Sequence, residues 1–204
     1  MLPEKVVLAS NNRGKLLELT GLLDGLGIHL QPQADFAVPE VAETGLSFVE
    51  NAILKARNAA LHAQLPAIAD DSGIEVEFLG GAPGIYSARY AGEGASDADN
   101  LELLLEQVRK SGLERPVARY QCVIVYITHG TDATPVIAHG TWHGHLVTEP
   151  RGSNGFGYDP MFFVPTHGCT SAELPPVEKN RISHRGQAMQ DLLHKLAALK
   201  GKGY

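Results

Sequence analysis

Two adjacent carboxylates, Asp70 and Asp71, follow a short apolar run at residues 67–69. Neighbouring side chains of an extended chain point to opposite faces, so one aspartate should face inward and the other a cleft. Carboxylates at the end of a buried strand suit Mg²⁺, which takes oxygen ligands and keeps several waters. Ser72 and Gly73 come next and predict a sharp turn. The pair is therefore either a metal site or a plain polar turn.

The residues after this pair favour a site. Ile74, Val76 and Phe78 alternate with glutamates, a pattern that predicts a half-buried strand. Three glycines and a proline then fall within residues 80–84. So much backbone freedom beside paired carboxylates is typical of a loop that approaches a ligand closely.

A second group of polar residues follows the first predicted strand, residues 5–9. A turn at residues 10–15 contains Arg13, Gly14 and Lys15, and leucines at helical spacing follow at 16–26. A strand, a turn and a helix in this order aim backbone N–H groups at an anion. The segment is not a Walker A loop, because leucine follows the lysine. It is either a phosphate-binding turn or a simple connection.

The next helix is predicted to start at a capping box, Ser47 to Glu50, and to reach about residue 63. Asn51, Lys55 and Asn58 share one of its faces, which is either a solvated face or part of a site. Glu43 precedes this helix, where a loop carboxylate can join Asp71 on a metal.

Further elements are predicted downstream. Residues 96–110 read as a capped helix, and the runs 117–128 and 136–142 as a β-hairpin. A second glycine-rich loop, residues 152–160, carries Phe156, which either stacks on a planar ligand or covers the edge of the core. Ser183 is a candidate cap for the last helix, which begins with His184 and Arg185.

Composition limits the classes of function. The 204 residues suffice for one substantial core or for two lobes that share a cleft. A net charge of −6 without a basic face argues against a nucleic acid polymer as partner. No apolar segment approaches membrane-spanning length, so no membrane association is expected. Two cysteines without metal-ligand spacing indicate a reducing compartment, and we expect a cytoplasmic protein.

Together, acids for a metal, bases for phosphates and a ring for a nucleobase describe a nucleoside triphosphate site. The chain resembles the inosine/xanthosine triphosphate pyrophosphatases. The matching segments are Ser10-Asn-Asn-Arg-Gly-Lys15, Glu43-Thr-Gly45, Glu50-Asn-Ala-Ile-Leu-Lys55-Ala, Ala69-Asp-Asp-Ser-Gly73, Gly80-Gly-Ala-Pro-Gly-Ile-Tyr-Ser-Ala-Arg-Tyr90, Gly155-Phe-Gly-Tyr-Asp-Pro160 and Ser183-His-Arg-Gly186. They follow one another in order over nearly the whole chain.

The resemblance implies an α/β fold with a long mixed twisted sheet and flanking helices, in one domain, residues 1–204, with two lobes around a central cleft. It implies a homodimer and Mg²⁺-dependent hydrolysis of ITP, dITP and XTP to the monophosphate and pyrophosphate. Asp71 and Glu43 resemble the metal carboxylates, and Asp71 also the general base. The phosphate-handling positions are Ser10, Asn11, Asn12, Arg13, Gly14, Lys15, Lys55 and Lys179. The nucleoside-binding positions are Ser72, Phe156, Gly157, Tyr158, Asp159, His184 and Arg185.

Two departures from the family pattern are visible. Ser10 stands where threonine is expected, and Pro175 and Pro176 precede Lys179 where a more helical run is usual. Two rival functions also stay open: a nucleotide phosphatase that releases orthophosphate and a nucleotide-binding regulator without turnover. The division of roles between Asp70 and Asp71, the preference among the three substrates and the exclusion of GTP are not set by the sequence.

Overall fold

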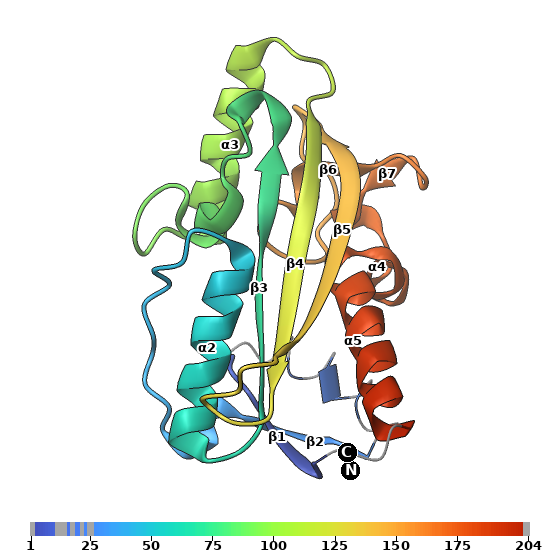
Figure 1. Cartoon of the computed structure of the whole chain (residues 1–204). Coiled ribbons are helices and arrows are strands. Elements are labelled where there is room, and N and C mark those ends of the chain that lie inside the picture. Colours follow the sequence, from blue (N-terminus) through green and yellow to red (C-terminus); the bar gives the residue numbers. More distant parts are fainter. Residues whose placement is uncertain (1–2, 11–15, 17–18, 21–22, 24–26, 202–204) are drawn as a thin grey trace. The chain divides into compact units, whose positions relative to one another are not determined.

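The structure, a computed structural model, describes residues 3–10, 16, 19–20, 23 and 27–201 (Figure 1). Within these residues seven strands form one mixed sheet of order β2-β1-β3-β4-β5-β6-β7. The strands are β1 (Lys5–Leu8), β2 (His29–Pro32), β3 (Ala67–Val76), β4 (Val117–Ile127), β5 (Val136–Leu146), β6 (Phe162–Val164) and β7 (Cys169–Thr170). β1 pairs in parallel with β2 and β3, and β6 pairs antiparallel with β5 and β7. The expected α/β fold with a long mixed sheet is confirmed.

Local signals start the two predicted central helices. The described helices are α2 (Phe48–Ala63), α3 (Asp97–Ser111), α4 (Pro176–Ile182) and α5 (His184–Gly201). At α2 the Ser47 hydroxyl accepts from the Glu50 N–H, and the Glu50 carboxylate accepts from the Leu46 N–H at 2.9 Å. At α3, Ser96 and Asp99 form a complete capping box. Such caps satisfy N–H groups that the helix itself leaves without partners.

The chain divides into two compact units. Unit 1 comprises Met1–Asp71, Cys122–Gly140 and Gln187–Tyr204, and unit 2 comprises Ser72–Gln121 and Thr141–Gly186. The chain passes from one unit to the other within β3, β4, β5 and α5. Each unit has its own buried apolar side chains.

In unit 1 the strands bury both of their faces, because alternate side chains point to opposite sides of a sheet. One set packs with the alanines of α2: Val7, Ala67, Ala69, Val123, Val125 and Ile127. The other set packs with Leu192 and Leu196 of α5: Val6, Leu8, Ile68, Cys122, Ile124, Tyr126 and Ala138. The fully buried apolar positions of α2 are all alanine, so the helix meets this face of the strands through short side chains.

In unit 2 one apolar cluster joins α3 to the strands and to the segment after β5. Leu104, Leu105 and Val108 of α3 pack in it with Ile74 of β3 and Trp142 of β5. Tyr158 of the glycine-rich loop, and Met161 and Phe162 directly after the loop, also belong to this cluster. This loop is therefore attached to the core at its C-terminal end.

Two sequence-based expectations need correction. The predicted turn at Ser72 and Gly73 is wrong: β3 continues through both residues to Val76, because neighbouring strands hold the backbone extended. The alternating strand predicted to reach Phe78 ends at Val76, and Glu77–Leu79 forms a short 3-10 turn. The predicted helix at 16–26 falls largely outside the described residues, although its Leu19 and Leu23 are buried.

Among the helices that the structure describes, none combines the length and the apolar character that crossing a bilayer requires.

Candidate functional site

A cluster of acids around Lys55 forms the first candidate site, in unit 1. Lys55 of α2 donates to Asp71 Oδ1 of β3 at 2.9 Å and to Glu43 Oε1 of the preceding loop at 3.0 Å. These three side chains are 19%, 10% and 26% exposed, so the ion pairs are mostly shielded from water. The expected proximity of Glu43 to Asp71 is thus observed, with a lysine between them.

Burial and charge change the pKa values in this cluster. Burial raises the pKa of Asp71 above its ordinary value, although Lys55 opposes the shift. Burial alone would lower the pKa of Lys55, but the charges of Asp71, Asp70 and Glu43 together raise it. Lys55 therefore stays protonated, and Asp71 is a stronger base than an exposed aspartate.

The donor set of this cluster fits a divalent cation. Asp71 Oδ2 is buried and has no hydrogen-bond partner among the described residues. Three carboxylates, those of Glu43, Asp70 and Asp71, act electrostatically on the one ammonium of Lys55, so the cluster is rich in the oxygen ligands that such a cation takes. The part of the chain that the structure describes holds no group of three or more His, Cys, Asp or Glu side chains spaced as a complete metal site. Mg²⁺ is usually bound by only one or two carboxylates, together with water and substrate phosphates. This cluster can supply the carboxylates.

Asn51 lies close to the acid–lysine cluster, but its environment differs from the one that the sequence pattern predicted. We expected it on the polar face of α2 with Lys55, but its side chain is fully buried. Its Oδ1 accepts from the Gly45 N–H at 2.9 Å, two residues after Glu43. A Cβ at Gly45 would lie 2.6 Å from the Glu50 Cβ, so only glycine permits this approach. Asn51 thus ties the loop that carries Glu43 to α2.

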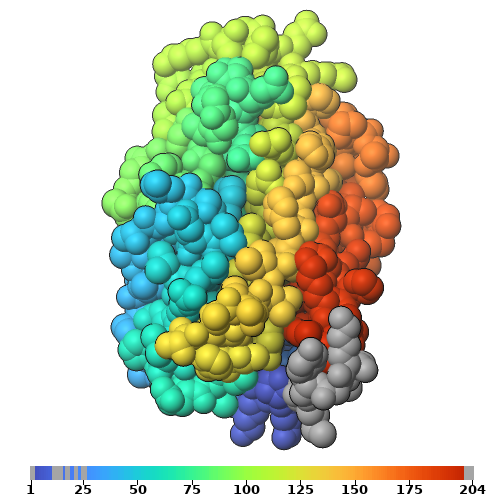
Figure 2. All heavy atoms as spheres, in the orientation of Figure 1, coloured from blue at the N-terminus to red at the C-terminus, as the bar shows by residue number. Residues whose placement is uncertain are grey.

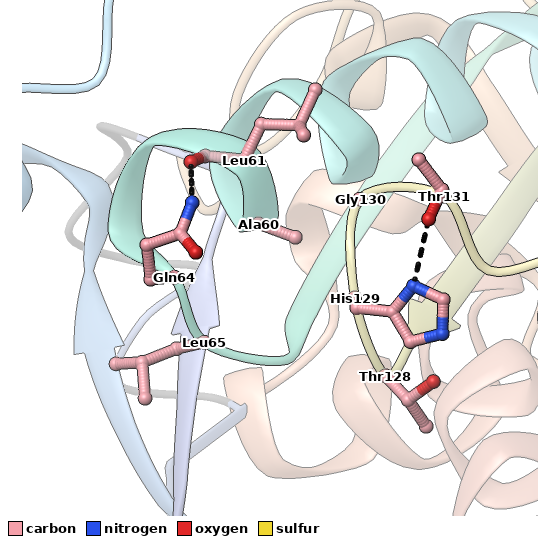
Figure 3. A pocket seen from close by; sticks show the side chains of 8 residues that line it. All are labelled: Ala60, Leu61, Gln64, Leu65, Thr128, His129, Gly130 and Thr131. Carbon is pink, nitrogen blue, oxygen red and sulfur yellow. Dashed lines mark hydrogen bonds between the residues drawn. The ribbon is translucent and has the colours of Figure 1, made fainter.

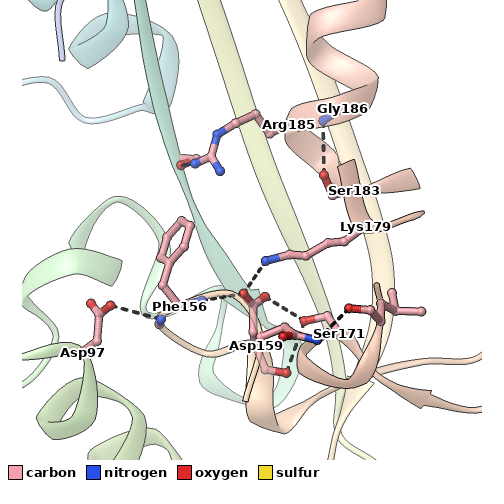
Figure 4. Close-up of polar contacts among 12 residues, drawn as sticks. Asp97, Phe156, Asp159, Ser171, Lys179, Ser183, Arg185 and Gly186 are labelled. Carbon is pink, nitrogen blue, oxygen red and sulfur yellow. Dashed lines mark hydrogen bonds and ion pairs between the residues drawn. The ribbon is translucent and has the colours of Figure 1, made fainter. Parts of the chain in front are cut away.

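A second set of side chains, in unit 2, surrounds the ring of Phe156 (Figure 4). Phe156 is 53% exposed on its glycine-rich loop, as the interpretation as a stacking residue requires. Lys179 Nζ lies 5.4 Å and Arg185 Cζ 5.6 Å from the centre of its ring. Two cations near one exposed aromatic ring favour a ligand that is planar and has acceptor atoms at its edge.

Asp159 organises this loop from within. The side chain is only 4% exposed, and its Oδ2 accepts from the Phe156 N–H at 2.9 Å and from Lys179 Nζ. Its Oδ1 accepts from the Ser171 hydroxyl at 2.7 Å. Gly155 has a φ of +79°, and a Cβ there would overlap Asp159 Oδ2 at 2.0 Å. Gly155 is therefore required both by its left-handed backbone conformation and by the close approach of Asp159.

Two further contacts fix the tip of the loop. The buried Tyr158 donates its hydroxyl to the Ser87 carbonyl at 2.7 Å. Gly157, with a φ of +58°, donates its N–H to Asp97 Oδ2 at 3.2 Å. Tyr158 and Asp159, expected to bind the nucleoside, are therefore buried parts of the loop framework, whereas Phe156 is exposed.

The start of α5 supplies His184 and Arg185. The Ser183 hydroxyl accepts from the Gly186 N–H at 3.2 Å, which confirms the predicted cap. A Cβ at Gly186 would lie 1.9 Å from the Asn180 carbonyl oxygen, so glycine allows α4 and α5 to approach. Arg185 donates to the Ser72 hydroxyl at 3.5 Å. The structure thus brings Ser72, Phe156 and Arg185 together.

His184, expected among the nucleoside-binding positions, is buried. Its ring stacks on Tyr120, with ring centres 4.6 Å apart and planes 8° apart. Burial raises the pKa of Tyr120 well above its ordinary value, so its hydroxyl stays neutral. Tyr120 and Asp97 were not expected near this site, because the sequence assigned them only to a strand and to the start of a helix.

The remaining predicted residues are only partly described. Asn11, Asn12, Arg13, Gly14 and Lys15 lie outside the described residues. Ser10 follows β1, and its N–H donates to the Leu8 carbonyl at 2.8 Å. Pro176 stands in the first turn of α4, where its missing N–H costs no hydrogen bond. The prolines therefore do not prevent Lys179 from lying on a helix.

A separate small pocket lies in unit 1, where the turn between β4 and β5 meets the C-terminal end of α2 (Figure 3). The space-filling view shows this turn, in yellow, next to α2, in teal (Figure 2). Its volume is about 230 Å³, and it is lined by Ala60, Leu61, Gln64, Leu65, Thr128, His129, Gly130 and Thr131. These eight residues include no carboxylate, lysine or arginine, so the pocket is not the acid–lysine cluster.

The mixed sheet and its flanking helices define an α/β protein, in which unit 1 carries the acid–lysine cluster and unit 2 carries the cation-flanked ring. The chain belongs to the Ham1 family, whose model matches residues 6–195.

Curated relatives and solved structures agree with this assignment. The chain is 54% identical over 195 residues to a dITP/XTP pyrophosphatase of Vibrio parahaemolyticus, covering 96% of this chain and 98% of the relative. It is 55% identical over 193 residues to the dITP/XTP pyrophosphatase of Escherichia coli K12, covering 95% and 98%. The structure of a HAM1 protein from Coxiella burnetii matches with a TM-score of 0.91 at 49% identity, over 97% of this chain and all of that one.

Proposed function

We propose that this protein is a nucleoside triphosphate pyrophosphohydrolase that removes non-standard purine nucleotides. It converts dITP, XTP and ITP to the monophosphate and pyrophosphate. The observation that carries the proposal is the cluster in which Lys55 bridges Asp71 and Glu43 in a chain of this family. Its relatives at 54% and 55% identity are named dITP/XTP pyrophosphatases.

The acid–lysine cluster serves the phosphate chemistry in this proposal. Asp71 and Glu43 would hold Mg²⁺, which would supply charge neutralisation for the phosphates and would make a bound water more acidic. Asp71 orients the attacking water and accepts its proton, a role that its raised pKa favours. The water oxygen attacks the α-phosphorus, and the bond to the bridging oxygen of pyrophosphate breaks. Lys55 and the segment Ser10 to Lys15 stabilise the negative charge on the phosphates.

The side chains around Phe156 serve recognition of the base. Phe156 stacks on the purine, and Arg185 donates to the O6 acceptor of hypoxanthine or xanthine. We assign Lys179 to this group instead of to the phosphates, because its Nζ lies near the Phe156 ring and binds Asp159. Gly157, Tyr158 and Asp159 hold the loop in place, while Ser72 and His184 complete the nucleoside site.

We further propose that residues 1–204 act as one functional domain and that the protein is a cytoplasmic homodimer. The support for the dimer is the family resemblance. The support for the compartment is the cysteine pattern of the sequence, since Cys122 and Cys169 lack metal-ligand spacing. Light scattering of the purified protein tests the dimer, and cell fractionation tests the compartment.

The decisive experiment measures turnover of ITP, dITP, XTP, GTP and ATP, with pyrophosphate and orthophosphate assayed separately. We expect pyrophosphate as the first product from ITP, dITP and XTP, and no reaction when EDTA removes divalent metal. Orthophosphate as first product would identify a phosphatase instead. Binding of the same nucleotides without any product would identify a regulator.

A further inference from the structure

A short segment, residues 170–174, makes several of the hydrogen bonds that hold the Phe156 loop and the residue before it, and all of its residues except Glu173 are buried. The Thr170 hydroxyl donates to the Arg151 carbonyl at 2.7 Å. The Asn154 N–H donates to the Ala172 carbonyl at 3.0 Å, and its side-chain amide donates to the Leu174 carbonyl at 3.1 Å. We call residues 170–174 the loop support.

Gly152 shows how closely the loop follows this support. Its φ is +83°, and a Cβ there would lie 2.4 Å from the backbone carbonyl of Ala172. The backbone of Gly152 is in direct contact with the backbone of the loop support, so the N-terminal half of the loop has little freedom to move.

Within the loop support, Ser171 is the residue whose side chain forms a hydrogen bond with the Asp159 carboxylate. Its hydroxyl donates to Asp159 Oδ1 at 2.7 Å and lies 3.2 Å from the Asp159 carbonyl oxygen. The residue is fully buried. With Oδ1 held by Ser171, Oδ2 faces both the Phe156 N–H and Lys179 Nζ (Figure 4).

We propose that Ser171 is a positioning residue for base selection, acting through Asp159 on Lys179, whose ammonium lies beside the Phe156 ring. The inference rests on the proposed function, because it concerns how that function recognises its base. Without the Ser171 hydroxyl, Asp159 Oδ1 is buried without its donor, and the carboxylate can rotate to find another. The Lys179 ammonium then loses its fixed position beside the Phe156 ring, where the edge of the base is expected.

The test compares Ser171→Ala with a control variant, Ser111→Ala. The Ser111 hydroxyl lies at the end of α3 and donates to the Val108 carbonyl at 2.7 Å. Calorimetry without metal measures the Kd of IMP and of AMP, so the readout does not require turnover. We expect Ser171→Ala to weaken IMP binding about tenfold, the effect of losing a hydrogen bond to a charged group, and AMP binding clearly less. Ser111→Ala should change neither. Equal weakening of IMP and AMP, or none, would overturn the proposal.

Two further measurements establish that Ser171 acts through Asp159. Ser171→Thr keeps the hydroxyl and should restore most of the selectivity. In an Asp159→Asn background, adding Ser171→Ala should cost less than it does in the wild type, because the partner carboxylate is already gone. Fully additive losses would refute the role of Asp159 even if the Thr variant does not fold.

Failure of the inference is distinguishable from failure of the proposed function. A wild type that releases pyrophosphate from ITP while Ser171→Ala keeps its selectivity overturns only the inference. A wild type that neither binds IMP nor hydrolyses ITP overturns both.

Discussion

The ammonium of Lys55 donates to Asp71 Oδ1 at 2.9 Å, which joins α2 to β3 inside unit 1. The same carboxylate has its other oxygen, Oδ2, buried without a hydrogen-bond partner among the described residues. One oxygen is thus held by Lys55, and the Asn51 side chain is close enough to the same carboxylate to lower its pKa.

Replacement of Asp71 by asparagine tests its role as base. Asp71→Asn keeps the shape of the side chain but removes its charge and its basicity. We expect kcat for ITP to fall by about 10² or more, the scale of a positioned acid–base group, while nucleotide binding largely remains. The exposed Asp35 in the same unit offers a matched control, and Asp35→Asn should have wild-type kcat. Near-normal turnover of Asp71→Asn would move the role to Asp70 or Glu43.

Removal of Lys55 should destabilise the protein. Lys55→Met leaves Asp71 and Glu43 shielded from water without their counter-charge. We expect the free energy of unfolding at pH 7 to fall by about 1–3 kcal/mol, measured by urea denaturation. Adding Asp71→Asn to this variant should restore part of the loss, because one uncompensated charge is then removed. A double variant less stable than Lys55→Met would contradict this account.

Asp132, in the turn between β4 and β5, predicts how stability depends on pH. Burial alone would raise its pKa, but hydrogen bonds from the N–H and hydroxyl groups of Thr128 and Thr134 lower the pKa to about 2. A lowered folded pKa means that the ionised carboxylate stabilises the fold above the unfolded pKa, by about 2 kcal/mol. This contribution is lost as the pH falls from about 4 through about 2.

Asp132→Asn isolates that effect. At pH 7 the variant should unfold at lower urea concentration than the wild type, and the gap should narrow as the pH falls through this range. A gap that stays constant down to pH 2 would show that another group is responsible.

The two parts of the base site should behave differently when removed. Arg185→Ala deletes donors that match the O6 acceptor of hypoxanthine but face the N6 amino group of adenine, so it should reduce kcat/KM for ITP more than for ATP. Phe156→Ala removes stacking, which any purine provides, and should weaken both substrates about equally. The ratio of kcat/KM values for ITP and ATP is the measurement. An equal loss on both substrates for Arg185→Ala would place the base-reading group elsewhere.

The sequence could predict features that depend on neighbouring residues. The caps at Ser47 and Ser96 are set by side chains three positions away, and both helices begin as expected. The expected turn at Ser72 failed for the opposite reason: the local preference of Ser-Gly is overridden by pairing within the sheet.

The candidate site residues likewise divide into those that sequence motifs predicted and those that only the folded chain revealed. The meeting of Glu43, Lys55 and Asp71 followed from motifs that the family shares. Asn51 lies in a matching segment but was given no role there, Ser171 lies in none, and their partners Gly45 and Asp159 are 6 and 12 residues away. Only the folded chain shows that a buried amide and a buried hydroxyl hold the two candidate sites in shape.

The alanines at the buried face of α2 have a consequence for how this protein tolerates change. Because Ala52, Ala56 and Ala59 are fully buried against the strands, their methyl groups act as a spacer of fixed thickness between the helix backbone and the sheet. A larger side chain at Ala56 would push outward the turn that carries Lys55, and a displacement of about 1 Å is enough to cost a positioned group much of its effect. The accuracy of the acid–lysine cluster is therefore maintained by residues that have no polar atoms in their side chains. Variation at these positions is constrained by chemistry in which they take no part.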